Sequence, residues 1–452
     1  MLPRRSFAIL LTAAACFAAG CRSKPPAVAA VPQPLDDSSA AALRWVDAHA
    51  MPWSTLDPGR AASDRAPFLA IVGNARVVGI SEMTEGAHEF PPLVQSILRT
   101  LAENSGFRGL AVQASMSDAL ELDRYVRTGV GDPRRLLRIL GSHWETQEML
   151  DLIEWMRTFN QGRTPADRIG FFGFELPNAA HAVQIATSLP DSVAGRPLST
   201  WLARELKCVA TGESAAWGRD GPAADSSFWN RCRTVAGAAV DSLAALRARI
   251  GDSRSSESVS FAEQAARLVQ HHVSVGLRRL PRHQVVAEHV MWAANSLGAD
   301  GKLLVWGRDV ESGRLVLDGN TMQSAVALAK TLGDRYRNFA FTFGEGSFRA
   351  RPVRPDKPEP DKERTMSARL AAPGSYEDVL GRARLDAFTL DMRSLPADTA
   401  GAWLKGPRPM RLISGVYTPD VPHAFETEIE FPKHFDALLF VRRATPAVPL
   451  KR

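Results

Sequence analysis

Apolar segments alternate along the chain with segments of helical periodicity. Short apolar runs predict buried strands at residues 77–80, 109–113, 169–174, 302–306, 338–343, 412–417 and 437–441. Leucine, isoleucine and valine recur at helical spacing in residues 41–50, 91–103, 118–126 and 148–159, which predicts helices there. This alternation favours an α/β fold with a mostly parallel sheet flanked by helices.

The alternation stops between about residues 179 and 294, where the pattern is almost wholly helical. Strands are predicted both before and after this stretch, so we interpret it as a helical insertion within one domain that spans residues 43–450. Residues 351–366 are rich in proline and charge and predict a loop.

The first 42 residues predict export rather than folded structure. Two arginines, Arg4 and Arg5, precede an apolar run at residues 7–17 that is too short to span a bilayer, which is typical of an export signal over residues 1–20. Residues 18–21, AAGC, resemble a lipobox and predict lipidation of Cys21, with a plain secretory signal as the alternative. The arginine pair also resembles a twin-arginine signal. Residues 21–42 are rich in Pro and Ala and predict a tether. We therefore expect an exported domain on the periplasmic side, anchored in a membrane through Cys21.

Charge limits the kinds of partner that we expect for the protein, and the cysteines bear on its compartment. The formal net charge is +6, and removing residues 1–20, which hold two arginines and no acid, leaves +4. Basic residues are interspersed with acids, which argues against a nucleic-acid partner. Cys208 and Cys232 flank a Gly- and Ser-containing loop between predicted helices, so an oxidising compartment would allow a disulfide between them. Two separate buried thiols are the alternative, and the spacing does not match a metal site.

The segment VVGISEMTEGAHEF, residues 77–90, concentrates ionisable groups where a strand is predicted to end and a helix to begin. In α/β proteins the carboxyl ends of strands surround the ligand, so Glu82, Thr84, Glu85 and His88 are candidate site residues. Each also has a structural interpretation. Glu82 or Thr84 would cap the next helix, Glu85 would be an acid in its first turn, and His88 would be a surface residue.

An ordered set of segments resembles the erythromycin esterase family and covers about residues 43–450. These segments are SEMTEGAHEF (81–90), GFRGLAVQ (106–113), DRYVR (123–127), Trp144, LDLIEWMR (150–157), GFFGFE (170–175), Arg282, LLVW (303–306), FTFGEGSF (341–348) and FDALLFV (435–441). The resemblance implies an α/β fold with a deep cleft for a small-molecule substrate. It also implies hydrolysis of a cyclic ester by water that a histidine activates, with no metal or cofactor.

The ionisable positions depart from the family pattern. Glu82 is kept, but the histidine that acts as general base in the family falls at Glu85, and the carboxylate of the second strand falls at Gln113. A glutamate starts with a pKa far below neutral, and burial or a like charge must raise it before it serves as a base. Glu82 and Glu85 are close enough in sequence to form such a coupled pair.

Two further histidines of the family, which follow the later strand, fall at Arg308 and Glu311, with Asp309 between them. A guanidinium at position 308 would offset nearby acids or bind an anionic group, and a plain ion pair of Arg308 with Glu311 is the alternative. These assignments assume that no other histidine lies beside Glu82.

Two functions remain open. The first is a hydrolase with altered chemistry that acts on an ester, lactone or related acyl bond in the cell envelope, in connection with antibiotic response. The second is a catalytically inactive lipoprotein of the same fold that binds a ligand or acts as a scaffold. Under the first hypothesis, Glu85→His is expected to raise any esterase rate.

Overall fold

The computed structural model describes residues 33–58, 65–189, 191–210, 226–251, 255–308, 313–314, 324–353, 362–368 and 370–451. The chain divides into two units, Met1–Pro34 and Leu35–Arg452. The predicted export signal and Cys21 lie outside the described residues. Within the described residues, no helix is both long and apolar enough to cross a membrane.

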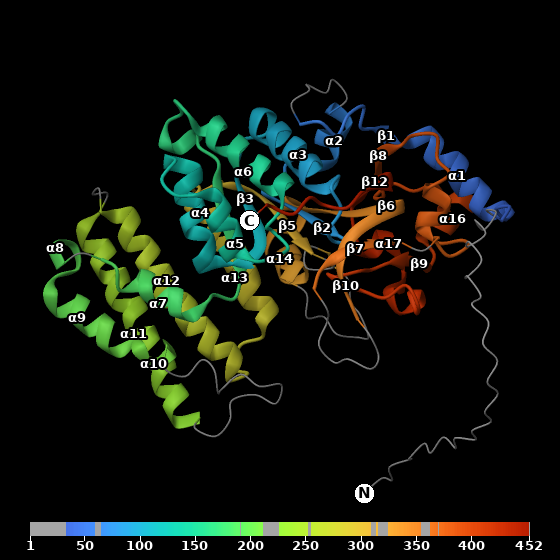
Figure 1. The fold of residues 1–452 in the computed structure, drawn as a ribbon. Helices are drawn as coiled ribbons and strands as arrows, with labels where there is room; N and C mark the ends of the chain where they lie inside the picture. Colours follow the sequence, from blue (N-terminus) through green and yellow to red (C-terminus); the bar gives the residue numbers. More distant parts are fainter. Residues whose placement is uncertain are drawn as a thin grey trace, which may run out of the picture. The chain divides into compact units, whose positions relative to one another are not determined.

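A ten-stranded sheet forms the centre of the second unit (Figure 1). Its main path runs in the order β1 (Met51–Pro52), β8 (Ala387–Asp391), β12 (Ala437–Ala444), β6 (Tyr336–Pro352), β2 (Val77–Glu82), β5 (Lys302–Arg308), β3 (Phe107–Ser115) and β4 (Gly170–Glu175). The strands from β12 to β4 are parallel, and β8 is antiparallel to β12. The predicted α/β fold with a mostly parallel sheet is therefore confirmed.

Two short strands pair with β6, and two others form a separate two-stranded sheet. The strands β7 (Arg364–Ser367) and β10 (Val416–Tyr417) pair with β6, whereas β9 (Arg408–Arg411) pairs with β11 (Glu426–Ile429). The predicted strand at 412–417 is thus mostly wrong. Gly415 has a φ of +67°, which interrupts extended backbone. Ile413 instead forms an isolated bridge with Thr84.

Helices cover both faces of the sheet because alternate residues of each strand point to opposite sides. Val78, together with Leu110 and Leu304, packs in the core that contains α2 (Ala66–Val72), α3 (Phe90–Asn104), α5 (Pro133–Leu140) and α6 (Gln147–Asn160). Their neighbours Val77 and Leu303 pack on the other face against α13 (Arg282–Ser296) and α14 (Ser324–Leu332). The other helices around the sheet are α1 (Asp37–His49), α4 (Met116–Thr128), α15 (Tyr376–Leu380), α16 (Thr399–Lys405) and α17 (Phe431–His434).

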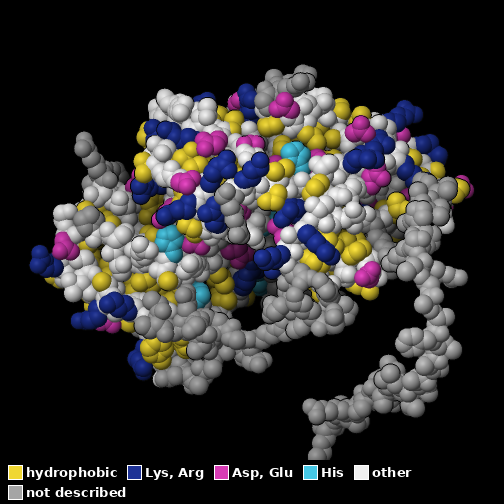
Figure 2. Space-filling model, viewed as in Figure 1, with side chains coloured by type: hydrophobic (Ala, Val, Ile, Leu, Met, Phe, Trp, Pro, Cys, Tyr) yellow, Lys and Arg dark blue, Asp and Glu magenta, His cyan; other side chains and the backbone are white. Residues whose placement is uncertain are grey.

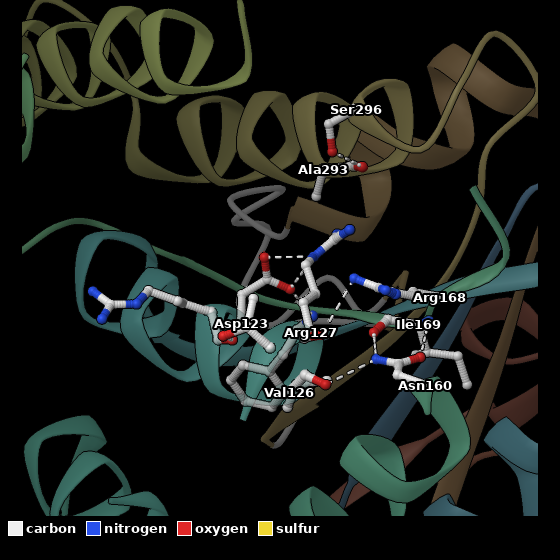
Figure 3. A network of polar contacts seen from close by, with 11 residues as sticks. Asp123, Val126, Arg127, Asn160, Arg168, Ile169, Ala293 and Ser296 are labelled. Atoms are coloured by element: carbon white, nitrogen blue, oxygen red, sulfur yellow. Dashed lines mark hydrogen bonds and ion pairs between the residues drawn. The ribbon is translucent and has the colours of Figure 1, made fainter. Parts of the chain in front are cut away.

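A buried polar network fixes α4 and α6 against β4 (Figure 3). The Asp123 carboxylate accepts hydrogen bonds from Arg127 Nε (2.7 Å) and from the Phe171 backbone N–H (2.7 Å), while burial raises the pKa of Asp123. The side chain of Asn160 accepts from Ile169 N–H (2.7 Å) and donates to Ile169 O (2.8 Å). This network anchors α6, whose first turn approaches the site described below.

The segment between β4 and β5 is helical, as a helical insertion requires. It contains α7 (Ala179–Ala186), α8 (Asp191–Ala194), α9 (Arg196–Glu205), α10 (Lys207–Ala210), α11 (Ser226–Ile250), α12 (Ser256–Gly276) and α13. The helices α7 to α12 share a core of their own, and α13 packs on the sheet. A disulfide joins Cys208 of α10 to Cys232 of α11, with a Cα–Cα distance of 5.8 Å.

On the face shown in Figure 2, Lys and Arg side chains are interspersed with Asp and Glu. The absence of a nucleic-acid partner stays a prediction.

Candidate functional site

Two carboxylates meet at the carboxyl end of β2. Glu82 ends the strand, Glu85 lies in the turn that leads to α3, and the side chains are 2% and 1% exposed. The backbone N–H of Glu85 donates to Ile413 O (3.1 Å), which ties the turn to the segment after β9. Gly86 has a φ of +80°, and a Cβ there would lie 2.2 Å from Arg349 O, so the tight turn requires glycine. The backbone contacts of this turn therefore fix the position of Glu85 relative to Glu82.

His143 lies between these carboxylates. Its Nδ1 is 3.3 Å from Glu85 Oε2, its Nε2 is 4.0 Å from Glu82 Oε2, and its side chain is 19% exposed. His143 belongs to the turn between α5 and α6, which is followed by Thr146, whose hydroxyl accepts from Met149 N–H as the N-cap of α6 (3.2 Å). An imidazole thus stands beside Glu82, contrary to the assumption made from the sequence.

Two tryptophans pack in series beside the imidazole. The ring of Trp144 contacts His143 edge-on, with centroids 4.7 Å apart, and Trp306 in turn (5.0 Å). Trp306 Nε1 donates a hydrogen bond to Glu82 Oε1 (2.8 Å). These contacts limit the rotation of the imidazole and of the Glu82 carboxylate, because large aromatic rings in a packed interior leave few alternative rotamers.

A small pocket opens at this cluster. Its volume of about 20 Å³ has room for roughly one water molecule. The lining residues are Glu82, Gly86, Ala87, Pro91, His143, Trp144, Thr146, Met149, Trp306 and Ala447. A water molecule in this pocket would lie among groups that include a carboxylate and an imidazole, which is an arrangement suited to proton transfer.

His88 lies apart from the cluster. Its Nδ1 is 2.5 Å from Glu148 Oε1, and its side chain is half-exposed. The hydrogen bond with Glu148 raises the pKa of His88, although burial acts in the opposite direction. His88 is not among the residues that line the pocket. Its contacts are those of a residue that holds two segments together.

Gln113 and Glu175 form a neighbouring cluster at the ends of β3 and β4. Gln113 Nε2 donates to Glu175 Oε1 (3.0 Å), and Glu175 is paired with Arg282 of α13. The backbone oxygen of Gln113 accepts from Trp144 Nε1 (3.4 Å), which connects this cluster to the pocket wall.

The remaining predicted site residues are only partly described. Thr84 is fully buried, and its backbone bridges Ile413. The backbone of Arg308 is in register with Glu82, so it ends β5 at the same edge of the sheet. Asp309 and Glu311 lie outside the described residues. Within the described ranges, no group of three or more His, Cys, Asp or Glu side chains is placed to hold a metal ion.

His143 could hardly be predicted from sequence. It directly precedes Trp144, which belongs to the resemblance, and it lies in a polar turn between two predicted helices. Its proximity to Glu85 depends on two turns meeting in space, and residue periodicity carries no information about that.

A parallel sheet with ionisable groups at the carboxyl end of its central strand is typical of α/β enzymes that act on small molecules. The erythromycin esterase family profile matches residues 102–444, more than half of the chain, so the chain belongs to the erythromycin esterase family. The family is named for an esterase, which is an enzyme of the hydrolase class. The match begins after Glu82 and Glu85 and includes His143.

Known proteins support this assignment. An erythromycin esterase type II of Escherichia coli is 25% identical over 133 residues, which cover 29% of this chain and 31% of that protein. A Bacillus cereus protein of known structure superposes with a TM-score of 0.77 at 22% identity, covering 92% of this chain and 100% of the other. A mutant of the erythromycin esterase EreC in its open conformation gives a TM-score of 0.63 at 15% identity, covering 87% and 97%. At these identities the structural likeness shows the fold alone.

Proposed function

We propose that the protein hydrolyses an ester, lactone or related acyl bond, and that His143 is the base that activates water. The observation that carries this proposal is the imidazole of His143 between the buried carboxylates of Glu82 and Glu85. A neutral imidazole is suited to general-base catalysis near neutral pH without further tuning.

The geometry defines a role for each residue. The carboxylate of Glu85 lies 3.3 Å from His143 Nδ1 and favours the tautomer that carries its proton on Nδ1, so that Nε2 is the proton acceptor. Nε2 removes a proton from a water molecule in the pocket while the water oxygen attacks the carbonyl carbon of the substrate. The tetrahedral intermediate then collapses, the carbon–oxygen bond to the leaving group breaks, and the imidazolium returns its proton to the departing alkoxide. Glu82, oriented by Trp306, stabilises the imidazolium through its negative charge.

This mechanism revises the interpretation of Glu85. The resemblance places the base of the family at position 85, where this chain has a glutamate, and the carboxylates of Glu82 and Glu85 were the expected substitutes. With His143 beside it, Glu85 instead orients a base that comes from another turn of the chain. In this chain the imidazole at the end of the central strand comes from position 143, not from position 85.

The location of the reaction is part of the proposal. An export signal followed by a lipidated Cys21 and a tether would hold the domain on the periplasmic side of a membrane. The disulfide between Cys208 and Cys232 supports an oxidising compartment. The similarity to an erythromycin esterase supports a substrate class that includes macrolide lactones and a part in the response to antibiotics.

The proposal is tested with the purified full chain on a panel of macrolides, simple lactones and aryl esters. His143→Gln is compared with His49→Gln, which changes an exposed histidine of α1. Turnover by the parent and by His49→Gln, with loss in His143→Gln, is the expected result. Equal rates in the parent and in His143→Gln would contradict the role of His143, and no turnover of any ester or lactone would contradict the hydrolase.

A binding or scaffold lipoprotein is the second candidate. The observation that favours it is the replacement of the two later family histidines by Arg308 and Glu311. Saturable binding of a panel compound without hydrolysis, measured by calorimetry, supports this function instead.

A further inference from the structure

The segment that follows β12, residues Thr445–Leu450, lies across two turns of the site and is called the strap below. On its first side it contacts residues 86–89. His88 N–H donates to Thr445 O (2.8 Å), and Ala447 N–H donates to Gly86 O (3.0 Å). The Glu89 carboxylate accepts from both the backbone N–H (3.0 Å) and the hydroxyl (2.6 Å) of Thr445.

On its second side the strap contacts residues 145–148. Gln147 N–H donates to Val448 O (2.7 Å), and Leu450 N–H donates to Glu145 O (3.0 Å). The Glu148 carboxylate accepts from Val448 N–H (2.9 Å). The strap is therefore hydrogen-bonded on both sides along most of its length, as an inserted strand would be.

Glu148 connects all three segments. Its carboxylate is 3% exposed and receives the backbone N–H of Val448 as well as the imidazole of His88. His88 belongs to the turn after Glu85, Glu148 to the beginning of α6 after the turn of His143, and Val448 to the strap. Hydrogen bonds to an ionised carboxylate are roughly twice as strong as those between neutral groups, so Glu148 is a firm attachment point.

The two turns held by the strap are the ones that carry the site. Glu85 directly precedes Gly86, and His143 lies two positions before Glu145. Between its two attachments, the strap places the buried side chain of Ala447 in the wall of the water-sized pocket.

We propose that the strap is a positioning element: it fixes the turn of His143 relative to the turn of Glu85 and supplies one wall of the pocket. This inference rests on the proposed hydrolase for its effect on rate. The strap keeps the distance between imidazole and carboxylate short and limits the space around them to one water molecule. Loosening the strap therefore lowers the rate of the chemical step more than it weakens substrate binding.

The experiment removes a single hydrogen bond of the strap. Val448→Pro deletes the N–H that Glu148 accepts, and Val448→Ala, at a half-exposed side chain, keeps it. With p-nitrophenyl acetate as the probe, kcat of Val448→Pro is expected to fall about tenfold while KM changes less than twofold, and Val448→Ala is expected to match the parent. Equal kcat values for the two variants would overturn the proposal.

Two readouts do not depend on turnover. Hydrogen exchange, followed by mass spectrometry, is expected to accelerate in residues 86–89 and 142–146 of Val448→Pro and not of Val448→Ala. The imidazole NMR signal of His143, assigned with His143→Gln, is expected to move in the same variant alone. An unmoved signal with unchanged exchange would overturn the positioning role even if the rate falls.

The two proposals fail in different ways. If the parent hydrolyses no ester, the proposed function fails, and exchange and NMR still decide whether the strap positions His143. If Val448→Pro does not fold, as judged by circular dichroism and thermal unfolding, Glu89→Ala replaces it, because it removes the acceptor of Thr445 at the other attachment. Parent-like exchange and rates in Glu89→Ala would then count against the strap.

Discussion

Two histidine environments in the described part of the chain differ in burial and in their neighbours. His143 lies between two carboxylates beside a pocket. In the helical region, His271 Nδ1 of α12 is 3.2 Å from His289 Nε2 of α13, and His289 Nδ1 is 3.0 Å from Phe174 O. Burial, with a further contribution from nearby Arg267, lowers the pKa of His271 to about 4, and burial together with His271 lowers that of His289 to about 3.

The comparison shows that burial and neighbours together determine what an imidazole does: His271 has a half-exposed carboxylate nearby (Glu288, 3.4 Å), whereas the two carboxylates beside the less buried His143 are themselves buried. The stacked pair of His271 and His289 stays neutral at physiological pH and joins two helices to the end of β4. The carboxylates of Glu82 and Glu85, within 4.0 Å of the His143 ring nitrogens, instead place negative charge where an imidazolium forms during the proposed reaction. Substitution of His143 is therefore expected to lower the catalytic rate, whereas substitution of His289 is expected to lower stability.

The largest effect is expected from His143→Gln. A positioned general base contributes about 10²- to 10⁴-fold to rate, so kcat for ester hydrolysis should fall by that factor. His289→Gln should lower stability and leave kcat of the remaining folded protein near the parental value. Steady-state kinetics with a thermal unfolding control measures both, and a similar loss of kcat in the two variants would remove the distinction between the regions.

Glu85→Gln removes the negative charge beside His143 and is expected to lower kcat by on the order of tenfold to a hundredfold, because that charge stabilises the imidazolium formed during the reaction and each ~1.4 kcal/mol lost is about tenfold in rate. Glu85→His restores the family residue but removes the carboxylate partner of His143. It is now expected to lower the rate, contrary to the expectation from sequence. A rate above the parental one, measured on the same ester, would return the role of the base to position 85.

Acid should lower the stability of the protein through His271, whose pKa is depressed by burial. The pKa of His271 is about 4 in the folded protein, below the ordinary value near 6.5, so the unfolded chain binds more protons between these pH values. Above pH 6.5 the neutral His271 therefore does not lower the free energy of unfolding. As the pH falls towards 4, this free energy is expected to decrease by on the order of 3 kcal/mol. Denaturant unfolding across this range should show a shallower pH dependence for His271→Gln than for His49→Gln. Equal slopes would contradict the assignment.

The smallest effect is expected from Ala447→Val. The added methyl groups fill a pocket of about 20 Å³ and compete with the water molecule, so kcat should fall about tenfold with little change in the unfolding temperature. Val448→Ala, one position along the strap, is the matched control. An unchanged kcat in Ala447→Val would indicate that the reacting water comes from elsewhere.

The sequence predicted the parallel strands of the sheet better than the strands at its antiparallel edge. Apolar runs marked β2, β3, β4, β5 and β12 because these strands are buried on both faces. The strand β8 and the two-residue strand β1 were not predicted, since short segments at an antiparallel edge carry a weak pattern.

Of the residues that form the candidate site, the sequence predicted those that follow β2 but not those from the other segments. Glu82 and Glu85 follow a strand directly, and the end of a central strand is a position that sequence can identify. His143 and Ala447 come from a turn and from the strap, and they reach the same pocket through contacts between distant parts of the chain. Local pattern says which residues are buried, but not which turns meet.

The strap also determines when the site is complete during synthesis. Thr445 and the Glu89 carboxylate that holds it are 356 positions apart. A ribosome therefore exposes the turn of Glu85 long before it releases the segment that covers it, and a nascent chain lacks the last wall of the pocket until translation has passed the final strand. Contacts over such a separation form slowly, so the protein is expected to gain its fold before it gains its reactivity.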